Sequence, residues 1–428
     1  MYLPGFEVRA EAYQEALGRC AAPMEVKRVA DHDEDAFTMA LEAARRALAP
    51  TPAGPVALLT ASADAPPMGA LLADALDLPA ARVAEFRGRT AGLDALLAAR
   101  DAAAHGEVLV VSADAPGGDP GDDAEHGQGA AATAWLVGPQ GGLRFVAEGH
   151  AARPAMGATA RDDEALSGAA RALPADRVAW LALADLDRGL AKAAQAALPK
   201  AQLVPASKRV GDGGATAPLL GLAAALDVAA EGSVVAALAA EAGVGVGIAL
   251  ERAGPVAGPG LRAALAERVE PLDYARLARL RSPAQAFAGG VSQGAAVSPA
   301  HYVESLPARL RWEGQRCEGC AKAVFPPRAA CQHCGGAAFQ MLRLRGRGSA
   351  HSVVTIGRGS APAEFADQQR RAGAYDVAIV ALEEGPRVAA MVAGPAGRLR
   401  IGDAVNLVVR RLYMQDGAPR YGFKAKPA

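Results

Sequence analysis

Four cysteines stand close together in the C-terminal third of the chain, in two Cys-x2-Cys pairs, Cys317/Cys320 and Cys331/Cys334. Each pair can present two thiolates on one side of a tight turn, and two facing turns supply four sulfurs tetrahedrally, as structural zinc requires. Such a site is closed to further ligands, so we expect the metal to stabilise the fold and not to catalyse a reaction. The same spacing also suits iron, and the sequence leaves that choice open.

The remaining cysteine, Cys20, is expected on a helix face, and His333, inside the second pair, is expected to be a solvated bystander. Paired Cys-x2-Cys turns indicate a metal site in a reducing compartment and not a disulfide framework. No run of about eighteen uncharged apolar residues is present, and the N-terminus lacks the layout of a secretory signal. We therefore expect a cytoplasmic protein that does not enter a membrane.

The chain has 428 residues, 51% of them hydrophobic and 4% aromatic, which predicts two or more ordered domains. Its formal net charge of -1 conceals an uneven distribution. From Arg309 onward basic residues outnumber acidic ones by about two to one, and the rest leans acidic. Only the C-terminal part could favour polyanions.

The N-terminal part alternates between apolar strands and amphipathic helices, which predicts a layered α/β fold. Helices are expected at residues 31–48, 68–76 and 90–104, and strands at residues 56–60, 83–86 and 108–111. A second cycle follows, with helices at 162–173, 186–198 and 218–226, a strand at 178–183 and a hairpin of 233–238 with 244–250. The chain thus repeats an α/β block twice.

Residues 255–307 lose this periodicity and are expected to form a partly helical connector. Beyond it the segments are short and β-rich, which predicts a small five-stranded barrel. We expect four parts: a thiolase-like domain at 1–252 with halves of about 1–150 and 151–252, a connector at 253–310, a zinc ribbon at 311–341 and an OB-fold barrel at 342–428.

The C-terminal part resembles the rubredoxin-type zinc ribbon and OB-fold domain that accompanies acyl-CoA-handling thiolase-like proteins. The resemblance is carried by the two cysteine pairs and by Phe325-Pro326-Pro327, Leu399-Arg400-Ile401-Gly402-Asp403 and Tyr421-Gly422-Phe423-Lys424. It implies a partner of the thiolase class and a structural zinc.

The upstream part resembles the hydroxymethylglutaryl-CoA synthase branch of the thiolase superfamily. The matching motifs are Tyr2-Leu3-Pro4, Asp33-Glu34-Asp35, Glu125 with Gly127-Gln128-Gly129, and Val210-Gly211-Asp212. This resemblance implies a duplicated fold of αβαβα layers and a coenzyme A thioester as ligand. It also implies a core strand before Tyr2.

Enzymes of that superfamily use a cysteine at a helix N-terminus, with histidine and asparagine completing the site. Here the nucleophile position falls on Gly88 or Arg89, and the strand 178–183 is apolar where the histidine belongs. Asp212 replaces the asparagine, and a carboxylate would repel a developing oxyanion. We therefore expect no catalytic residue in this domain.

The other histidines are expected at the surface and without a catalytic role. They are His32, His105, His126, His150, His301 and His351. Arg343, Arg345 and Arg347 are expected to alternate along one strand face of a basic barrel, together with Arg410, Arg411 and Lys424. CoA phosphates or an acidic partner domain would use this charge.

Three functions remain open. The first is a non-catalytic subunit that scaffolds an acyl-CoA thiolase or synthase complex, paired with a catalytic thiolase-fold subunit or with itself. The second is a hydroxymethylglutaryl-CoA synthase-like acyltransferase, which needs a nucleophile that the sequence does not offer. The third, ranked last, is an OB-fold nucleic-acid binder, because the barrel has few aromatic residues for base stacking.

Overall fold

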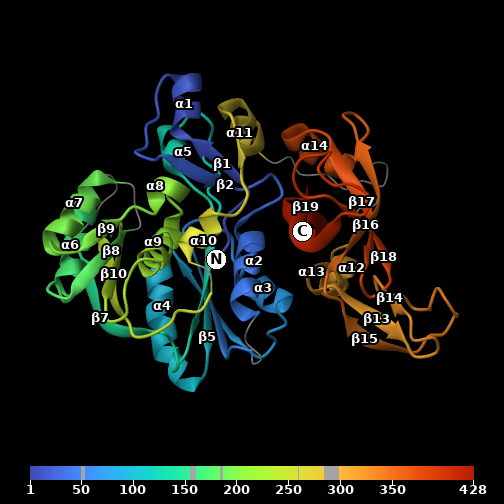
Figure 1. Cartoon of the computed structure of the whole chain (residues 1–428), viewed down its shortest axis with the longest axis horizontal. Helices are drawn as coiled ribbons and strands as arrows, with labels where there is room; N and C mark the ends of the chain where they lie inside the picture. Colours follow the sequence, from blue (N-terminus) through green and yellow to red (C-terminus); the bar gives the residue numbers. More distant parts are fainter. Residues whose placement is uncertain (50–53, 155–160, 184–186, 259, 284–297) are drawn as a thin grey trace. The chain divides into compact units, whose positions relative to one another are not determined.

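The structure is a computed structural model that describes residues 1–49, 54–154, 161–183, 187–258, 260–283 and 298–428 (Figure 1). It divides into two compact units. Unit 1 consists of Met1–Ala30 and Glu34–Ala278, and unit 2 consists of Asp31–Asp33 and Arg279–Ala428. The finer division into four domains stays a prediction, and residues 259 and 284–297 of the expected connector lie outside the described residues.

Unit 1 contains a first sheet with the strand order β4-β3-β5-β6. Its strands are β3 (Ala57–Ser62), β4 (Arg82–Arg87), β5 (Val108–Asp114) and β6 (Ala131–Val137). Strand β3 is parallel to both β4 and β5, and β6 is antiparallel to β5. Because β3 and β5 are buried along their whole length, they read as continuous apolar runs in the sequence.

The second sheet repeats this arrangement with the order β7-β11-β10-β8-β9. Its strands are β7 (Leu143–Ala152), β8 (Val178–Leu183), β9 (Gln202–Val204), β10 (Val234–Glu241) and β11 (Val244–Arg252). Strands β9-β8-β10-β11 match β4-β3-β5-β6 in order and direction. The expected duplication and the hairpin of β10 with β11 are therefore confirmed.

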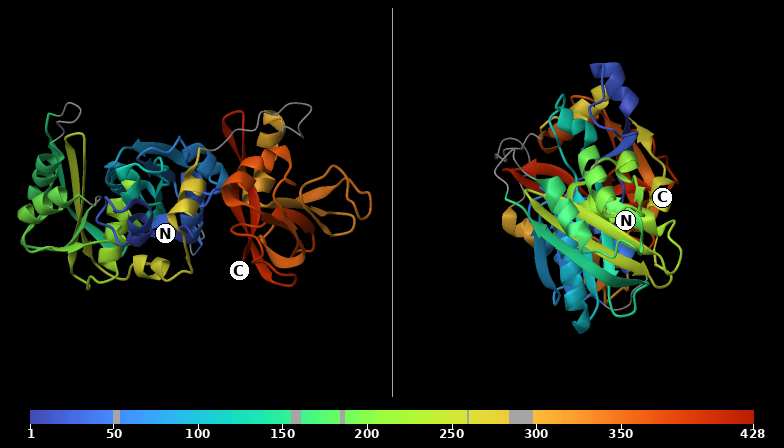
Figure 2. Two further views of the ribbon diagram at one scale, coloured as in Figure 1. Left: turned by 90° about the horizontal axis from the view of Figure 1, so that it is seen from above. Right: turned by 90° about the vertical axis from the view of Figure 1, so that its left-hand side faces the viewer.

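Two helices lie between the sheets, and further helices cover the outer faces, giving five layers (Figures 1 and 2). The inner helices are α4 (Ala91–Ala102) and α9 (Ala217–Leu226). The outer ones are α2 (Ala36–Leu48) and α3 (Gly69–Ala75) on the first sheet, and α6 (Asp162–Arg171) and α7 (Arg188–Ala197) on the second. This is the αβαβα architecture that the resemblance implied.

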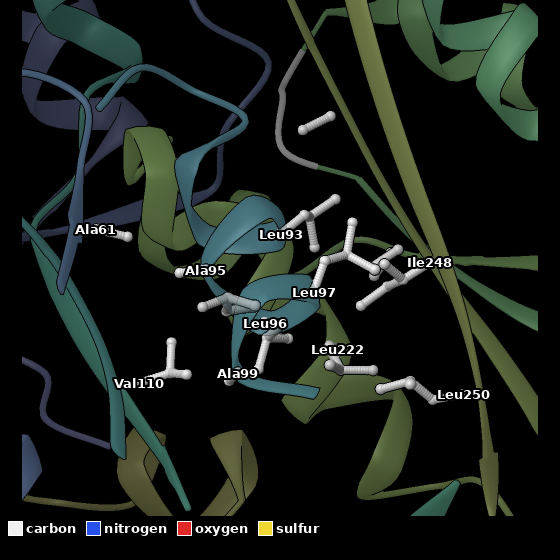
Figure 3. Close-up of a cluster of buried hydrophobic side chains, with 14 of the residues drawn as sticks. Ala61, Leu93, Ala95, Leu96, Leu97, Ala99, Val110, Leu222, Ile248 and Leu250 are labelled. Atoms are coloured by element: carbon white, nitrogen blue, oxygen red, sulfur yellow. The ribbon is translucent and has the colours of Figure 1, made fainter. Parts of the chain in front are cut away.

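The inner layer is packed with small apolar side chains. Figure 3 shows Leu96 and Leu97 of α4 between Val110 of the first sheet and Ile248 of the second, with Leu222 of α9 nearby. Alanine is frequent in both inner helices, which keeps the side chains between helix and sheet short. The alanine-rich composition is thus explained by a helix layer that must fit between two sheets.

Shorter elements complete unit 1. A three-stranded sheet has the order β12-β1-β2, formed by β1 (Phe6–Arg9), β2 (Val26–Val29) and β12 (Glu270–Pro271). The remaining helices are α1 (Ala10–Leu17), α5 (Asp123–Gly127), α8 (Ser207–Val210), α10 (Leu261–Leu265) and α11 (Tyr274–Arg281). Strand β6 lies at the edge of the first sheet and forms a single bridge there, from Ala132 to Tyr2. In the second sheet, strand β7 covers the corresponding edge of β11.

Unit 2 begins with two short helices and a ribbon, and ends with a five-stranded barrel. The helices are α12 (Pro299–Glu304) and α13 (Leu306–Arg311), and the ribbon strands are β13 (Glu313–Cys317), β14 (Ala323–Val324) and β15 (Phe339–Arg343). The barrel strands are β16 (Arg347–Ile356), β17 (Tyr375–Leu382), β18 (Arg387–Met391), β19 (Ala404–Gln415) and β20 (Ala418–Pro427). Helix α14 (Ala366–Ala372) lies between β16 and β17 in sequence.

The barrel strands follow the order β18-β17-β16-β19-β20, and a bridge between Val392 and Ala425 connects the two ends. Inward-facing Ala378, Val380 and Leu407 form its core. This closed order of five antiparallel strands agrees with the predicted OB-fold. Among the described residues, no helix has the length and apolarity to cross a membrane.

The expected basic strand face is wrong in two respects. Arg343 ends β15 and Arg347 begins β16, so the three arginines do not share one strand. Lys424 is fully buried, with its Nζ 2.8 Å from Oδ2 of Asp33, and Arg410 Nε lies 3.7 Å from Oδ1 of the same carboxylate. Burial of these two cations beside Asp33 removes them from the barrel surface.

Helix α4 lies close to the backbone just before α9, and a substitution at Gly92 can test this contact. A Cβ atom added to Gly92 of α4 would lie 2.3 Å from the carbonyl oxygen of Ala215. Gly92→Ala should lower the free energy of unfolding by about 1–3 kcal/mol through overpacking, although alanine is the better helix former. Gly117→Ala is the control, because nothing lies within 4 Å of its added Cβ. Urea unfolding of both variants would measure the difference, and an unchanged or raised stability for Gly92→Ala would contradict this packing.

Candidate active site

The position that the resemblance assigns to a nucleophile lies just before α4 and holds a cation. Arg89 precedes the helix, and its Nη2 donates a hydrogen bond of 2.7 Å to Oδ2 of Asp212. The side chains of Arg89 and Asp212 are 26% and 17% exposed, so this ion pair is largely shielded from water. The structure thus brings together the positions that the resemblance assigns to the nucleophile and to the asparagine, which Arg89 and Asp212 occupy here.

A second carboxylate lies at the same helix start. The backbone N–H of Arg89 donates to Oε2 of Glu241 at 2.8 Å, and Glu241 ends strand β10. Since the N-terminus of a helix carries partial positive charge, a carboxylate is stabilised there. Glu241 and Asp212 come from the second half of unit 1 and Arg89 from the first, so we call these three residues the central charge cluster.

The chemistry of this cluster is that of an internal ion network. A guanidinium stays protonated and cannot attack a thioester. Strand β8 is apolar throughout, and its buried end, Leu183, offers no imidazole at the position where the resemblance implies a histidine. The amide of Gly214 donates to Oδ1 of Asp212 at 3.0 Å, which adds to the shielding of this carboxylate. That the domain has no catalytic residue stays a prediction.

A buried carboxylate fixes the loop that carries Asp212. Asp114, at the end of β5, accepts hydrogen bonds from the Ser62 hydroxyl at 2.8 Å and from the Thr216 amide at 3.3 Å. The amide of Ala63 donates to it at 2.8 Å. Burial raises the pKa of Asp114 to about 6, because these hydrogen bonds offset only part of the loss of hydration. Asp114 thereby connects the ends of β3 and β5 to the start of α9.

Glu125, a motif residue of the resemblance, is buried and paired. Its Oε1 lies 2.6 Å from Nζ of Lys27 and accepts from the Tyr13 hydroxyl at 3.0 Å. All three side chains are almost completely buried. This hydrogen-bonded ion pair joins α5 to α1 and β2.

Two expectations about single residues are wrong. Cys20 lies in the loop after α1 and not on a helix, and its thiol hydrogen-bonds to the carbonyl of Ala22 at 3.5 Å. His32 and His126 are buried and not at the surface. The Nδ1 of His126 accepts from the amide of Ala21, because the loop after α1 packs onto α5.

The four clustered cysteines lie in the ribbon of unit 2. One sulfur from each residue lies within 4.8 Å of the others, and these residues are Cys317, Cys320, Cys331 and Cys334. Such a set of four thiolates fits one structural zinc ion. The amide of His333 donates to Sγ of Cys331 at 3.5 Å and lowers the pKa of this thiol to about 7, which favours the thiolate that a metal requires. The imidazole of His333 belongs to an exposed residue.

Five aromatic residues of unit 2 contact one another in the part of the chain that the structure describes. Phe365 contacts Tyr375 and Tyr413 with ring centroids 6.3 and 5.9 Å apart. Phe325 and Phe423 lie 5.6 Å apart at the barrel core. Single-stranded nucleic acids need exposed aromatic faces beside a cationic groove. The barrel therefore does not favour the nucleic-acid function.

Two residues of the site were missed by the sequence analysis, Glu241 and Asp114. Both are acidic residues at the end of an apolar strand, where a charged side chain after a buried run is a usable signal. Their proximity to α4 and α9 depends on how the two halves pack. Spacing along the chain therefore could not predict that these two carboxylates lie near α4 and α9.

The central charge cluster predicts that its cation stabilises unit 1. Arg89→Ala should lower the free energy of unfolding by about 1–3 kcal/mol, since Asp212 would lose its cation in a shielded site, whereas the backbone N–H that binds Glu241 remains. Arg100→Ala is the matched control, because Arg100 pairs with the exposed Asp101 and Glu148. Exposed pairs contribute about 0–1 kcal/mol. If both variants lose the same free energy of unfolding in chemical denaturation, the ion pair of Arg89 stabilises unit 1 no more than an exposed pair does.

The raised pKa of Asp114 predicts a pH dependence with a defined sign. Between pH 4 and 6, roughly, the folded state keeps this proton while the unfolded state releases it. Stability from this group should therefore fall as pH rises through that window, by up to about 3 kcal/mol, and stay level above it. Side-chain carboxyl NMR should give a midpoint near 6 that disappears in Asp114→Asn. A midpoint near the ordinary value of about 4 would refute the assignment.

The thiolate cluster predicts a stoichiometric metal. The purified protein should contain about one zinc ion per chain, and Cys331→Ser should reduce this content to near zero and unfold the ribbon. Cys20→Ser is the control, because Cys20 lies outside the cluster. Elemental analysis and limited proteolysis would measure both effects. Full zinc content in Cys331→Ser would exclude this residue as a ligand.

Comparison with known families identifies the ribbon. Residues 305–340 match the family model described as ChsH2, rubredoxin-like zinc ribbon domain. A DUF35 domain-containing scaffold protein of Methanothermobacter thermautotrophicus is 33% identical over 28% of this chain and 90% of its own length. Benzoylsuccinyl-CoA thiolase subunit BbsA of Thauera aromatica is 28% identical over 26% of this chain and 73% of that protein.

Other relatives share the thiolase-like fold. Hydroxymethylglutaryl-CoA synthase of Thermococcus gammatolerans is 31% identical over 32% of this chain, which spans 43% of the synthase. The solved structure of MvaS in complex with 3-hydroxy-3-methylglutaryl coenzyme A superposes with a TM-score of 0.54 at 20% identity, covering 67% of this chain and 92% of that protein, and shows the shared fold. The chain belongs to the family of DUF35 domain-containing proteins, and it carries their zinc-ribbon module together with a thiolase-like, hydroxymethylglutaryl-CoA synthase-like unit.

Proposed function

We propose that this protein is a non-catalytic subunit that scaffolds an acyl-CoA thiolase or synthase complex and helps form its acyl-CoA site. The central charge cluster carries this proposal: Arg89 occupies the start of α4 and is neutralised by Asp212, with Glu241 on its amide. A site closed in this way lacks the sulfur nucleophile that acyl transfer in this fold requires. The relatives named as a scaffold protein and as a thiolase subunit support the same role.

The fold leaves room for a thiolase-fold partner at the edge of the first sheet. Among the described residues, strand β4 pairs with β3 alone, and most of its residues are exposed, Val83 and Ala84 among them. An unpaired edge strand is a template for pairing with another chain. A catalytic thiolase-fold subunit, or a second copy, is the partner that this edge supports.

Zinc in this scheme is structural. We assign its ligands to Cys317, Cys320, Cys331 and Cys334, which lie in a ribbon that is too small to be stabilised by an apolar core alone. Reduced thiolates require a reducing compartment, for which we propose the cytoplasm. The acyl-CoA would bind to the complex and react on the partner.

A direct test uses labelled acetyl-CoA and intact-mass measurement. The protein alone should acquire no acyl adduct, because its helix start presents an arginine where the nucleophile would stand. A cysteine-containing thiolase-fold protein from the same genome, treated in parallel, should be acylated and serves as the positive control. Co-expression of the two should give a complex with thiolase or synthase activity.

The alternative, that the chain is itself a hydroxymethylglutaryl-CoA synthase-like acyltransferase, predicts the opposite mass result. A stoichiometric adduct on a side chain of the isolated protein would replace the scaffold proposal with this alternative. Arg89→Lys is a useful comparison, since it keeps a cation at the helix start and should remain unlabelled in the same way.

A further inference from the structure

We propose that unit 2 holds an anion-binding site, formed by Arg309 and Arg420, for a diphosphate group. The two side chains lie over the ring of one buried tyrosine, Tyr302, and each guanidinium keeps its outer nitrogen atoms for a ligand. We call these three residues the arginine clamp. Such a site belongs to this chain alone and does not depend on the proposed scaffold function.

Both guanidinium groups stack on the ring of Tyr302. The Cζ atoms of Arg309 and Arg420 lie 5.4 and 4.8 Å from the ring centroid, so these two carbons can be no farther apart than the sum of the two distances. Tyr302 is 8% exposed, and its hydroxyl accepts a hydrogen bond of 2.7 Å from the amide of Tyr421. The ring is therefore a fixed support, and its negative face attracts both cations.

Both guanidiniums also lie on the same face of strand β20. A Cβ atom added to Gly422 would lie 3.7 Å from Nη1 of Arg309. Side chains two residues apart on a strand point to the same face, so Arg420 extends on the face where this guanidinium lies. Tyr413 of β19 is the cross-strand neighbour of Arg420. The two cations thus converge on one face of the β19–β20 hairpin although they are far apart in the sequence.

Each guanidinium is fixed by one hydrogen bond and leaves its outer nitrogens unused. Nε of Arg309 donates to Oγ of Ser305 at 2.7 Å, and Nε of Arg420 donates to Oε1 of Gln415 at 3.1 Å. Within the described ranges of the chain, the Nη atoms of both arginines have no hydrogen-bond acceptor and no carboxylate partner. These are the atoms that bind oxyanions in bidentate pairs. Because both half-buried side chains are already ordered, a ligand loses little free energy in ordering them.

The charges around the arginine clamp favour an anion. Burial raises the pKa of Tyr302 and of Tyr413, and both arginines oppose this rise at each phenol, whereas Glu364 adds to it at Tyr413. Two cations and one carboxylate thus act on these phenols. Glu304 and Asp416, the acidic residues nearest to the clamp in sequence, are exposed and form no ion pair with either arginine in the described part of the chain. The clamp therefore keeps an excess of positive charge.

The number of free donors favours a ligand with two anionic ends. The Nη groups of two guanidiniums donate more hydrogen bonds than the oxygens of one carboxylate can accept in bidentate pairs. A diphosphate has charged oxygens at both ends and can pair with both arginines. Free diphosphate and coenzyme A both carry this group. Single-stranded nucleic acid is the weaker candidate, because the guanidiniums already cover the ring of Tyr302 on which a base would stack.

Isothermal titration calorimetry of the full chain with inorganic diphosphate tests the site. Arg309→Gln and Arg420→Gln should each raise the Kd for diphosphate by at least about tenfold, because each removes a charge-assisted bidentate pair. Arg420→Lys keeps the charge without the planar fork and should raise the Kd by a smaller factor. Arg400→Gln is the matched control, since it removes the same charge from an exposed arginine before β19, at the opposite end of that strand from Tyr413. Circular dichroism and zinc content report whether each variant is folded.

Titration with coenzyme A in parallel distinguishes the two sources of the diphosphate group. If the glutamine variants of the clamp weaken the binding of both ligands, the site takes coenzyme A; if they weaken inorganic diphosphate alone, it takes the free anion. If the wild type binds neither ligand, or Arg400→Gln loses as much affinity as the clamp variants, the anion site is refuted. A single-stranded oligonucleotide that binds the clamp more tightly than diphosphate would overturn the assigned ligand class. The scaffold function is tested by co-expression, so either proposal can fail alone.

Discussion

The constraint on which unit 1 depends is the insertion of two helices between two sheets. Each inner helix must bury both of its sides, so α4 and α9 are built from alanine, leucine and glycine, and backbone approaches backbone closely at Gly92. Close packing in such a layer leaves little freedom to move one half against the other. The start of α4, just before Ala91, is consequently held beside groups from the second half.

That placement also sets the surroundings of the residues at the start of α4. The start of an inner helix is partly positive, and it lies beside a loop and a strand end of the other half. Catalysis would need an ionisable sulfur there. In this chain the location holds one cation, Arg89, beside the carboxylates of Asp212 and Glu241. These groups form a network that joins the two halves of unit 1.

The ribbon and the barrel of unit 2 are stabilised in different ways. A ribbon of a few dozen residues cannot bury enough apolar surface to fold alone, so four thiolates and a metal replace the missing core. The barrel beside it closes its sheet on itself and needs no such support.

The sequence by itself determined the elements and the metal site. Cysteine spacing predicted the thiolate cluster because both pairs are local, and strand and helix periodicity predicted the duplicated layers because burial imposes those periods. It also determined that no cysteine lies at the start of α4. Tertiary structure alone decided that Arg89 meets Asp212 and Glu241 and that Lys424 is buried against Asp33. The reason is that these contacts join residues far apart in the chain, and only the packing of sheets and helices sets the distances between them.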